Sequence, residues 1–507
     1  MTDNGSAAKS PTEPPNDNAR RLRDKVDRLL ARAPTLAQGS ILADDGRRLD
    51  YAVRAAFVPV ASADMGADQG DAQAAIFSIA YTVPAEGPAP RPVCFAFNGG
   101  PGSASVWLHL GALGPQRVPV HDDGSMPPSP WRLVDNPLTW LTHFDLVFID
   151  PPHTGFSICA SDDARKRMLS VDGDVAALAE VMRAWLAANG RFGAPLYLAG
   201  ESYGTTRGAA LADKLLDLGL ALDGLILVSC AMDMQSVVFA PRNDLPYALF
   251  LPAFANVAQY HGLLAGPLGA SPEAARSAAE AFVADDYLAA LHAGARLQGQ
   301  ARRRIEKRVS ELTGLPLAVV EEKNLRISDQ CFFFEALRSR GRIVGRLEAR
   351  CTGPMAASRT RDWEFDPGID ALHAPYTTAA LTYYAALGIP TEARYEVLNM
   401  EVNKGWCWTR GEGKGRVEAN GFTCTSTDLS RALRRQPHLR VFAASGRYDL
   451  GTPYSASDWS LAQLDVPADV LARVSHHHYD AGHMFYTRSD DLRRLKSDLT
   501  AWLQVAD

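Results

Sequence analysis

Cysteine is scarce in this sequence, and neither sign of charge dominates it. Seven cysteines among 507 residues are odd in number and widely spaced, so they do not form a disulfide framework. Lys and Arg total 52 against 58 Asp and Glu, so the basic domain typical of nucleic-acid binding is missing. No apolar run approaches the roughly 18 residues of a membrane span. We therefore expect a globular protein without nucleic-acid or membrane partners; the composition leaves its oligomeric state open.

The few cysteines allow two interpretations. Cys407 could pair with Cys424, and Cys331 with Cys351, or all could be small buried apolar residues. The N-terminal residues, which include Pro11, are polar and lack the apolar segment of a secretory signal. As written, the chain is predicted to be cytoplasmic; a removed leader would make it periplasmic or secreted.

Short apolar runs alternate with helical patterns over much of the chain. Asp45-Gly46 predicts a hairpin turn between two strands within 41–60. Val171 to Ala188 has the spacing of an amphipathic helix. The apolar runs, each ending at Gly, Pro, Asp or a small residue, are Val93–Phe97, Leu146–Ile149, Leu196–Ala199, Leu225–Val228 and Leu439–Ala443. This alternation predicts an α/β fold, with a mostly parallel sheet covered by helices on both faces.

The alternation stops in the middle of the chain, where helical patterns dominate, and later resumes. We therefore expect four parts: a polar tail and short helix (1–40), a first part of the α/β core (41–242), an inserted, mainly helical cap (243–427) and a second part of the core (428–507). In such sheets the functional residues lie beyond the carboxyl ends of the strands.

One strand end carries a nucleophile motif. Leu196–Ala199 leads into Gly200-Glu201-Ser202-Tyr203-Gly204, and a helix-compatible segment follows. This strand–turn–helix context is the one that a nucleophile elbow requires, with glycines where the tight turn leaves no room for side chains. The motif predicts Ser202 as a catalytic nucleophile.

A nucleophilic serine needs a base, and the base needs an acid to orient it. In this fold class the acid and then the histidine follow the serine in the chain. Asp449 stands just after a predicted strand, and His483 stands beside Gly482, which allows a tight bend. We predict Ser202, Asp449 and His483 as the catalytic triad. Asp458, Asp465 and Asp469 do not follow strands and are weaker candidates.

Three consecutive histidines, His476, His477 and His478, invite a metal-binding interpretation. They are predicted to lie in a strand, where adjacent side chains point to opposite faces. We therefore predict no metal site in this chain.

A glycine-rich loop follows the strand Val93–Phe97. No Gly-Lys-Ser/Thr follows it, so it is not a phosphate-binding loop. A tetrahedral intermediate needs backbone N–H donors. Gly100 in this loop and Tyr203, directly after the nucleophile, are the predicted oxyanion donors.

Together these segments resemble the serine carboxypeptidase family. The resemblance lies in the order and spacing of Asn98-Gly99-Gly100-Pro101-Gly102-Ser103-Ala104-Ser105, Asp150-Pro151-Pro152-His153-Thr154-Gly155-Phe156-Ser157, Gly200-Glu201-Ser202-Tyr203-Gly204 and Gly482-His483-Met484. It implies an α/β-hydrolase core with an inserted helical cap, no cofactor, and release of C-terminal amino acids from peptides. It also implies that Asn98 and Glu201, with Gly99 beside them, bind the terminal carboxylate of the substrate, and that Glu201 shares a proton with it.

The chain departs from the family pattern at three positions. Ala96 stands where the family usually has Trp, Ala112 where it has Glu, and Ser103 where it has Cys. The first two changes remove partners from the carboxylate-binding network, and we expect Glu201 to find another partner, such as an arginine of the cap.

Three functions follow from these observations. The first is a serine-type carboxypeptidase acting through an acyl-enzyme. The second is an esterase or acyltransferase that uses the same triad on ester substrates. The third is a non-enzymatic scaffold, which the filled triad positions disfavour.

Overall fold

The computed structural model describes residues 17–61, 71–411 and 421–504. Its centre is a ten-stranded sheet with the order β1-β2-β3-β7-β4-β9-β10-β13-β14, in which β8 also pairs with β3. The strands of this sheet are β1 (Thr35–Leu42), β2 (Arg48–Val60), β3 (Ala74–Thr82), β4 (Val93–Phe97), β7 (Asp145–Ile149), β8 (Ile158–Cys159), β9 (Leu196–Glu201), β10 (Gly224–Val228), β13 (Arg440–Gly446) and β14 (Val474–Tyr479).

The sheet is parallel from β7 to β14 and antiparallel from β1 to β3. The predicted hairpin is present, with β1 and β2 joined around Gly46. Strand β1 begins at Thr35, inside the segment that we expected to hold only a tail and a helix. Half-buried Gly39 and exposed Ser40 interrupt its apolar pattern, and this hides the strand in the sequence.

Helices cover both faces of the parallel part, as the alternation predicts. One apolar core joins alternate strand residues such as Phe95 and Val147 to helices α4 (Val171–Ala188), α5 (Tyr203–Asp217) and α14 (Ser426–Arg435). The other core joins residues such as Ala96 and Phe148 to α12 (Pro367–Ala386) and α17 (Ser489–Gln504). Successive residues of the central strands therefore face alternate buried layers.

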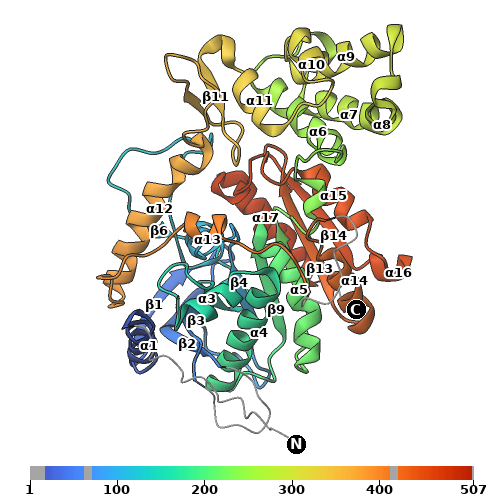
Figure 1. The fold of residues 1–507 in the computed structure, drawn as a ribbon. Coiled ribbons are helices and arrows are strands. Elements are labelled where there is room, and N and C mark those ends of the chain that lie inside the picture. The colour runs from blue at the N-terminus through green and yellow to red at the C-terminus, as the bar shows by residue number, and fades with distance from the viewer. Residues whose placement is uncertain (1–16, 62–70, 412–420, 505–507) are drawn as a thin grey trace, which may run out of the picture.

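A third apolar core lies outside the sheet. In Figure 1 the helices that build it stand together above the carboxyl edge of the sheet: α6 (Leu245–Tyr260), α7 (Pro272–Phe282), α8 (Leu288–Ala293), α9 (Gly299–Thr313), α10 (Leu317–Glu322) and α11 (Asp329–Glu335). Tyr448 and Leu450 join this core from the loop after β13. Helix α12, although it falls in the range assigned to the cap, packs on the sheet instead.

Shorter elements complete the described chain. They are α1 (Asp17–Leu30), α2 (Val106–Leu108), α3 (Asp162–Met168), α13 (Met400–Lys404), α15 (Tyr454–Ala462), α16 (Ala468–Leu471), β5 (Gln116–Arg117), β6 (Val134–Asp135), β11 (Arg342–Val344) and β12 (Thr352–Pro354). Over these same ranges, no helix combines the length and apolar character that crossing a bilayer requires. All seven cysteines are described and free, so neither of the two possible disulfides is formed.

Candidate active site

Ser202 stands at the sharp turn between strand β9 and helix α5. Its backbone has φ 60° and ψ −128°, a conformation that a non-glycine residue keeps only where the surrounding structure enforces it. A Cβ on Gly200 would lie 2.2 Å from the carbonyl oxygen of Gly204, and one on Gly204 would lie 3.0 Å from that of Phe97. The turn therefore requires glycine at 200 and leaves little room at 204, as the motif predicts.

Asp449 and His483 follow two neighbouring parallel strands, β13 and β14, and meet beyond their ends. Nδ1 of His483 lies 2.7 Å from Oδ2 of Asp449, and both side chains are buried. The carboxylate also accepts hydrogen bonds from the N–H of Gly451, from the N–H of Thr452 and from the Thr452 hydroxyl. These bonds fix the carboxylate, and the carboxylate fixes the ring.

Ser202 and His483 line one cavity of about 670 Å³ beneath the cap. That size suits a small organic or peptide ligand. Six of the eight predicted site residues line it: Asn98, Gly99, Gly100, Glu201, Ser202 and His483. Asp449 and Tyr203 are buried behind it. Within the described residues Ser202 Oγ makes no hydrogen bond, so the hydroxyl and the imidazole share the cavity without being joined.

The charges around His483 favour its protonated form. Burial lowers the pKa of His483, but the charge and hydrogen bond of Asp449, together with the charge of Glu201, raise it above the usual value. The ring can therefore hold the proton that it would remove from a serine hydroxyl. The described protein offers no hydrogen-bond partner for Nε2, which leaves this nitrogen available to the cavity.

The two predicted oxyanion donors lie on adjacent segments. A Cβ on Gly99 would lie 2.4 Å from the backbone nitrogen of Tyr203, so the glycine-rich loop passes directly over the start of helix α5. Neither the Gly100 nor the Tyr203 N–H donates a hydrogen bond to another described residue. Unused N–H groups next to a serine are what a developing oxyanion needs.

Asn98 presents a donor without a protein partner. Its Oδ1 accepts a hydrogen bond from the N–H of Leu108 at 3.0 Å, which fixes the orientation of the amide. Its Nδ2 is buried and has no hydrogen-bond partner in the described protein. An unsatisfied buried donor is costly unless a ligand engages it. Asn98 lines the cavity, so this unpaired donor lies next to the space that a ligand would occupy.

Glu201 is a buried acid beside the nucleophile. Burial raises the pKa of Glu201 to about 7, against the lowering effects of the His483 charge and of a hydrogen bond from Tyr486. The Tyr486 hydroxyl donates to Oε2 at 2.6 Å. Glu201 can therefore carry a proton near neutral pH and donate it in a hydrogen bond to an anionic ligand.

Tyr486 is the site residue that the sequence did not reveal. It lies in the turn Phe485–Thr487, directly after the His483 loop, and its hydroxyl takes the place of the cap arginine that we expected beside Glu201. The Tyr486 ring packs so closely on Gly111 that a Cβ there would lie 2.5 Å from it. Gly111 directly precedes Ala112, which stands where the family has glutamate. The nearness of Tyr486 to His483 in the chain was the available signal.

Arg207 was also missed, although it lies one turn after Ser202. It is buried, pairs with Asp174 at 2.6 Å, and donates to the carbonyl oxygen of Asn98 at 2.8 Å. Its guanidinium also lies over the Phe97 ring. Arg207 therefore ties the nucleophile helix to the backbone that carries Asn98.

The connection between β11 and β12 reaches down from the cap and touches both triad loops. Leu450 N–H donates to the carbonyl oxygen of Arg346, and His483 N–H donates to that of Leu347. Glu348 accepts from Gly482 N–H at 2.9 Å. The cap therefore helps to hold the positions of Asp449 and His483, and the exposed Arg346 side chain lines the cavity.

The three departures from the family pattern are accommodated without gaps in hydrogen bonding. Ala96 and Ala112 are buried in the apolar core. The Ser103 hydroxyl accepts a hydrogen bond from Trp107 Nε1 at 2.9 Å.

The three consecutive histidines lie on alternate faces of β14, as expected for a strand. His477 does point away from its neighbours, but His476 and His478 share a face of β14 and meet Asp458 of α15 there. These three side chains offer ligand atoms within 4.8 Å of one another. The prediction of no metal site, which considered only adjacent residues, stays a prediction.

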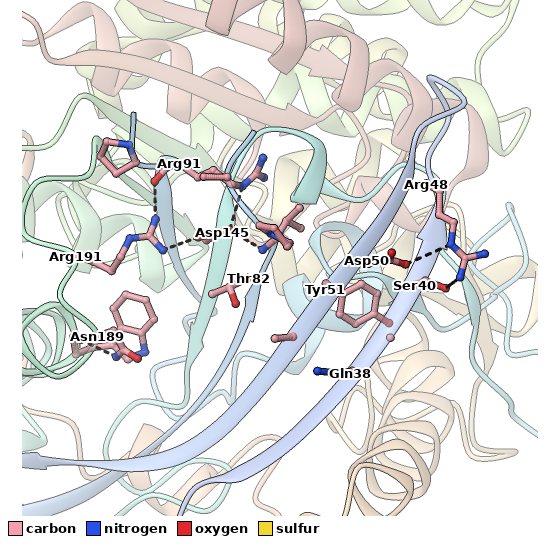
Figure 2. Close-up of a pocket in the computed structure, with 17 residues that line it drawn as sticks. Gln38, Ser40, Arg48, Asp50, Tyr51, Thr82, Arg91, Asp145, Asn189 and Arg191 are labelled. Atoms are coloured by element: carbon pink, nitrogen blue, oxygen red, sulfur yellow. Dashed lines mark hydrogen bonds and ion pairs between the residues drawn. The ribbon is translucent and has the colours of Figure 1, made fainter. Parts of the chain in front are cut away.

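The acids that precede Ser202 in the chain hold loops in place. Asp150 accepts from Ser105 N–H at 2.9 Å. Asp145 pairs with Arg91 at 3.2 Å and Arg191 at 2.6 Å. Figure 2 shows the ion pairs of Asp145 with Arg91 and Arg191. These residues line a larger, open cavity of about 970 Å³. This cavity lies at the amino ends of the parallel strands, on the edge opposite the triad.

Known proteins resemble this chain in sequence and in fold. Residues 71–221 match the sequence model of a family described as serine carboxypeptidase. The structure is similar to a prohormone-processing carboxypeptidase from Saccharomyces cerevisiae, with 14% identity, a TM-score of 0.53, and coverage of 89% of this chain and 91% of that one. The chain has the α/β-hydrolase fold.

Other solved structures align less well. A proline iminopeptidase from Mycobacterium smegmatis has 13% identity, a TM-score of 0.35, and covers 93% of this chain and 100% of its own. A putative aryl esterase from Burkholderia cenocepacia has 11% identity and a TM-score of 0.34, and the alignment covers 92% of this chain and 99% of the esterase. No curated protein matches the sequence. The family match over 71–221, which includes the elbow, supports a serine hydrolase.

Proposed function

We propose that this protein is a serine-type carboxypeptidase. Ser202 attacks the last peptide carbonyl, and His483 takes its proton and then gives it to the leaving amine. Asp449 holds the imidazolium that forms between these steps. Water then releases the acyl group from Ser202 with His483 again acting as base. The N–H groups of Gly100 and Tyr203 stabilise the oxyanion in both steps.

The observation that carries the specificity is the pair of groups beside Ser202. Asn98 offers an unpaired buried Nδ2, and Glu201 is an acid whose pKa burial raises to about 7. An amide donor and a protonated carboxyl can together bind a carboxylate without placing two negative charges in contact. Both residues line the cavity of Ser202. A free C-terminus bound there would present its last peptide bond to the serine.

The test compares a blocked dipeptide with its C-terminal amide. Loss of charged hydrogen bonds costs about 1.5–3 kcal/mol each, so kcat/KM for the amide should fall about 10- to 100-fold or more. A blocked amino-acid ester, assayed in parallel, checks that the triad is working. Equal rates on the dipeptide and its amide would contradict carboxylate recognition.

An esterase or acyltransferase is the second candidate. The observation in its favour is that Ala96 and Ala112 stand where the family has Trp and Glu, so Glu201 has fewer partners. This function would give fast ester cleavage and no preference between the dipeptide and its amide.

A further inference from the structure

Two histidines and an aspartate converge on the outer edge of the sheet, away from the Ser202 cavity. His476 and His478 project from the same face of β14, the last strand of the sheet, and their rings lie 4.3 Å apart. Asp458 reaches them from helix α15. Its Oδ1 lies 2.7 Å from Nδ1 of His476, and its Oδ2 lies 3.3 Å from Nε2 of His478.

The chemistry and spacing of these groups fit a transition-metal ion. Imidazole nitrogens and a carboxylate oxygen are zinc ligands, and three protein ligands with one open position make a common zinc site. Residues i and i+2 of a strand place two imidazoles on one side. All three ligand atoms lie within 4.8 Å of one another.

A second interaction fixes the ring of His476. The Ser457 hydroxyl donates to the carbonyl oxygen of Cys230, and the Ser445 hydroxyl donates to Ser457. Ser445 Oγ is then the acceptor for Nε2–H of His476 at 2.9 Å. Nδ1 of His476 is hydrogen-bonded to Asp458 in this structure, and it becomes the nitrogen free to bind an ion once that carboxylate moves away. A hydrogen bond on the far nitrogen is the usual support for a metal-binding histidine.

We propose that Asp458, His476 and His478 bind a divalent transition-metal ion, with zinc as the best match to the donor set. The Asp458 side chain is 45% exposed and that of His478 is 25% exposed, so an ion can enter from solvent. Two metal–ligand bonds of about 2 Å need more than the present 2.7 Å between Asp458 and His476, so the carboxylate moves outward on binding.

The bound ion would join the two chain segments that carry the triad partners. Strand β14 leads into the His483 loop, and α15 follows the Asp449 loop. A metal that clamps β14 to α15 therefore stabilises the folded state at the base of the triad. This inference does not depend on the identity of the substrate.

The test uses the full chain, freed of metals with a chelator, and measures zinc binding by calorimetry and by thermal unfolding. We expect one strong site and a rise in the unfolding temperature with zinc. His478→Gln and Asp458→Asn should lose both responses. Ser445→Ala, which removes the support of His476, should weaken binding about 10- to 100-fold.

His477→Gln is the matched control, because His477 stacks on Phe442 on the opposite face. It should bind zinc like the wild type. Equal zinc binding and equal thermal shifts in wild type and His478→Gln would overturn the proposal, since other histidines and cysteines would then hold the ion. Absence of binding to the wild type would overturn it as well.

Discussion

The protein contains two Asp–His pairs of equal length in very different surroundings. His483 and Asp449 are 2.7 Å apart, with side chains 5% and 0% exposed. His476 and Asp458 are also 2.7 Å apart, but Asp458 is 45% exposed. The first pair keeps Nε2 of its histidine available to a cavity with a serine, whereas in the second Ser445 occupies Nε2. The short distance therefore does not identify a catalytic pair; the second nitrogen and its surroundings do.

The largest effect on kcat should distinguish His483 from His477, which lies in the preceding strand β14. His483→Gln removes the base, and kcat should fall by about 10⁵-fold or more. His477→Gln changes a ring that faces the other side of the sheet edge, and kcat should stay close to wild type. Ester hydrolysis under saturating substrate measures both. Similar losses in the two variants would remove His483 from its assigned role.

A second contrast between buried and exposed ion pairs concerns stability. Arg207→Met leaves the buried Asp174 without its partner, so the free energy of unfolding should fall by about 3–5 kcal/mol. Arg431→Met breaks pairs of an arginine that is 49% exposed, and the change should stay within about 1 kcal/mol. Urea unfolding measures both. A larger loss in Arg431→Met would contradict the burial argument.

A third variant removes the hydroxyl of Tyr486, the hydrogen-bond partner of Glu201. Tyr486→Phe removes a hydrogen bond that lowers the pKa of Glu201, so this pKa should rise further above its usual value. At low pH, where Glu201 is protonated in both proteins, peptide kcat/KM should fall about 5- to 10-fold because Glu201 loses the hydrogen bond that orients it. The rise of KM with pH should begin at higher pH. Tyr376→Phe is the control, because that buried hydroxyl has no hydrogen-bond partner in the described protein. Identical pH profiles in wild type and Tyr486→Phe would contradict the assignment.

The smallest change is Glu201→Gln, which replaces a titrating acid with a neutral amide. In the wild type, KM for peptides should rise as pH increases through about 7, because ionised Glu201 repels the substrate carboxylate. The variant should lack this rise and still hydrolyse esters at neutral pH. Its ester profile, which depends on His483, should shift to lower pH, because the charge of Glu201 no longer raises the pKa of His483. An unchanged peptide profile in the variant would show that Glu201 does not titrate in this range.

Local patterns predicted much of the fold. The apolar runs beginning at Val93 and Leu196 are strands, and Val171–Ala188 is a helix with the predicted bounds. Each of these depends on residues close in sequence. The elbow at Ser202 was recognisable for the same reason, since its glycines are set by a turn of five residues.

Contacts between distant segments were not predictable. Tyr486 reaches Glu201 from the far end of the chain, and the β11–β12 connection reaches Asp449 and His483 from the cap. No local pattern encodes these approaches. The Asp458 cluster was missed because the sequence does not show that α15 lies over β14.

The most direct test of the central claim is covalent labelling of the nucleophile. The wild-type protein is treated with a fluorophosphonate, and the modified residue is located by peptide mapping in the wild type, Ser202→Ala and His483→Gln. The account predicts one adduct, on Ser202, with no labelling of Ser202→Ala and very slow labelling of His483→Gln. An adduct on another residue, or equal labelling of Ser202→Ala, would contradict it.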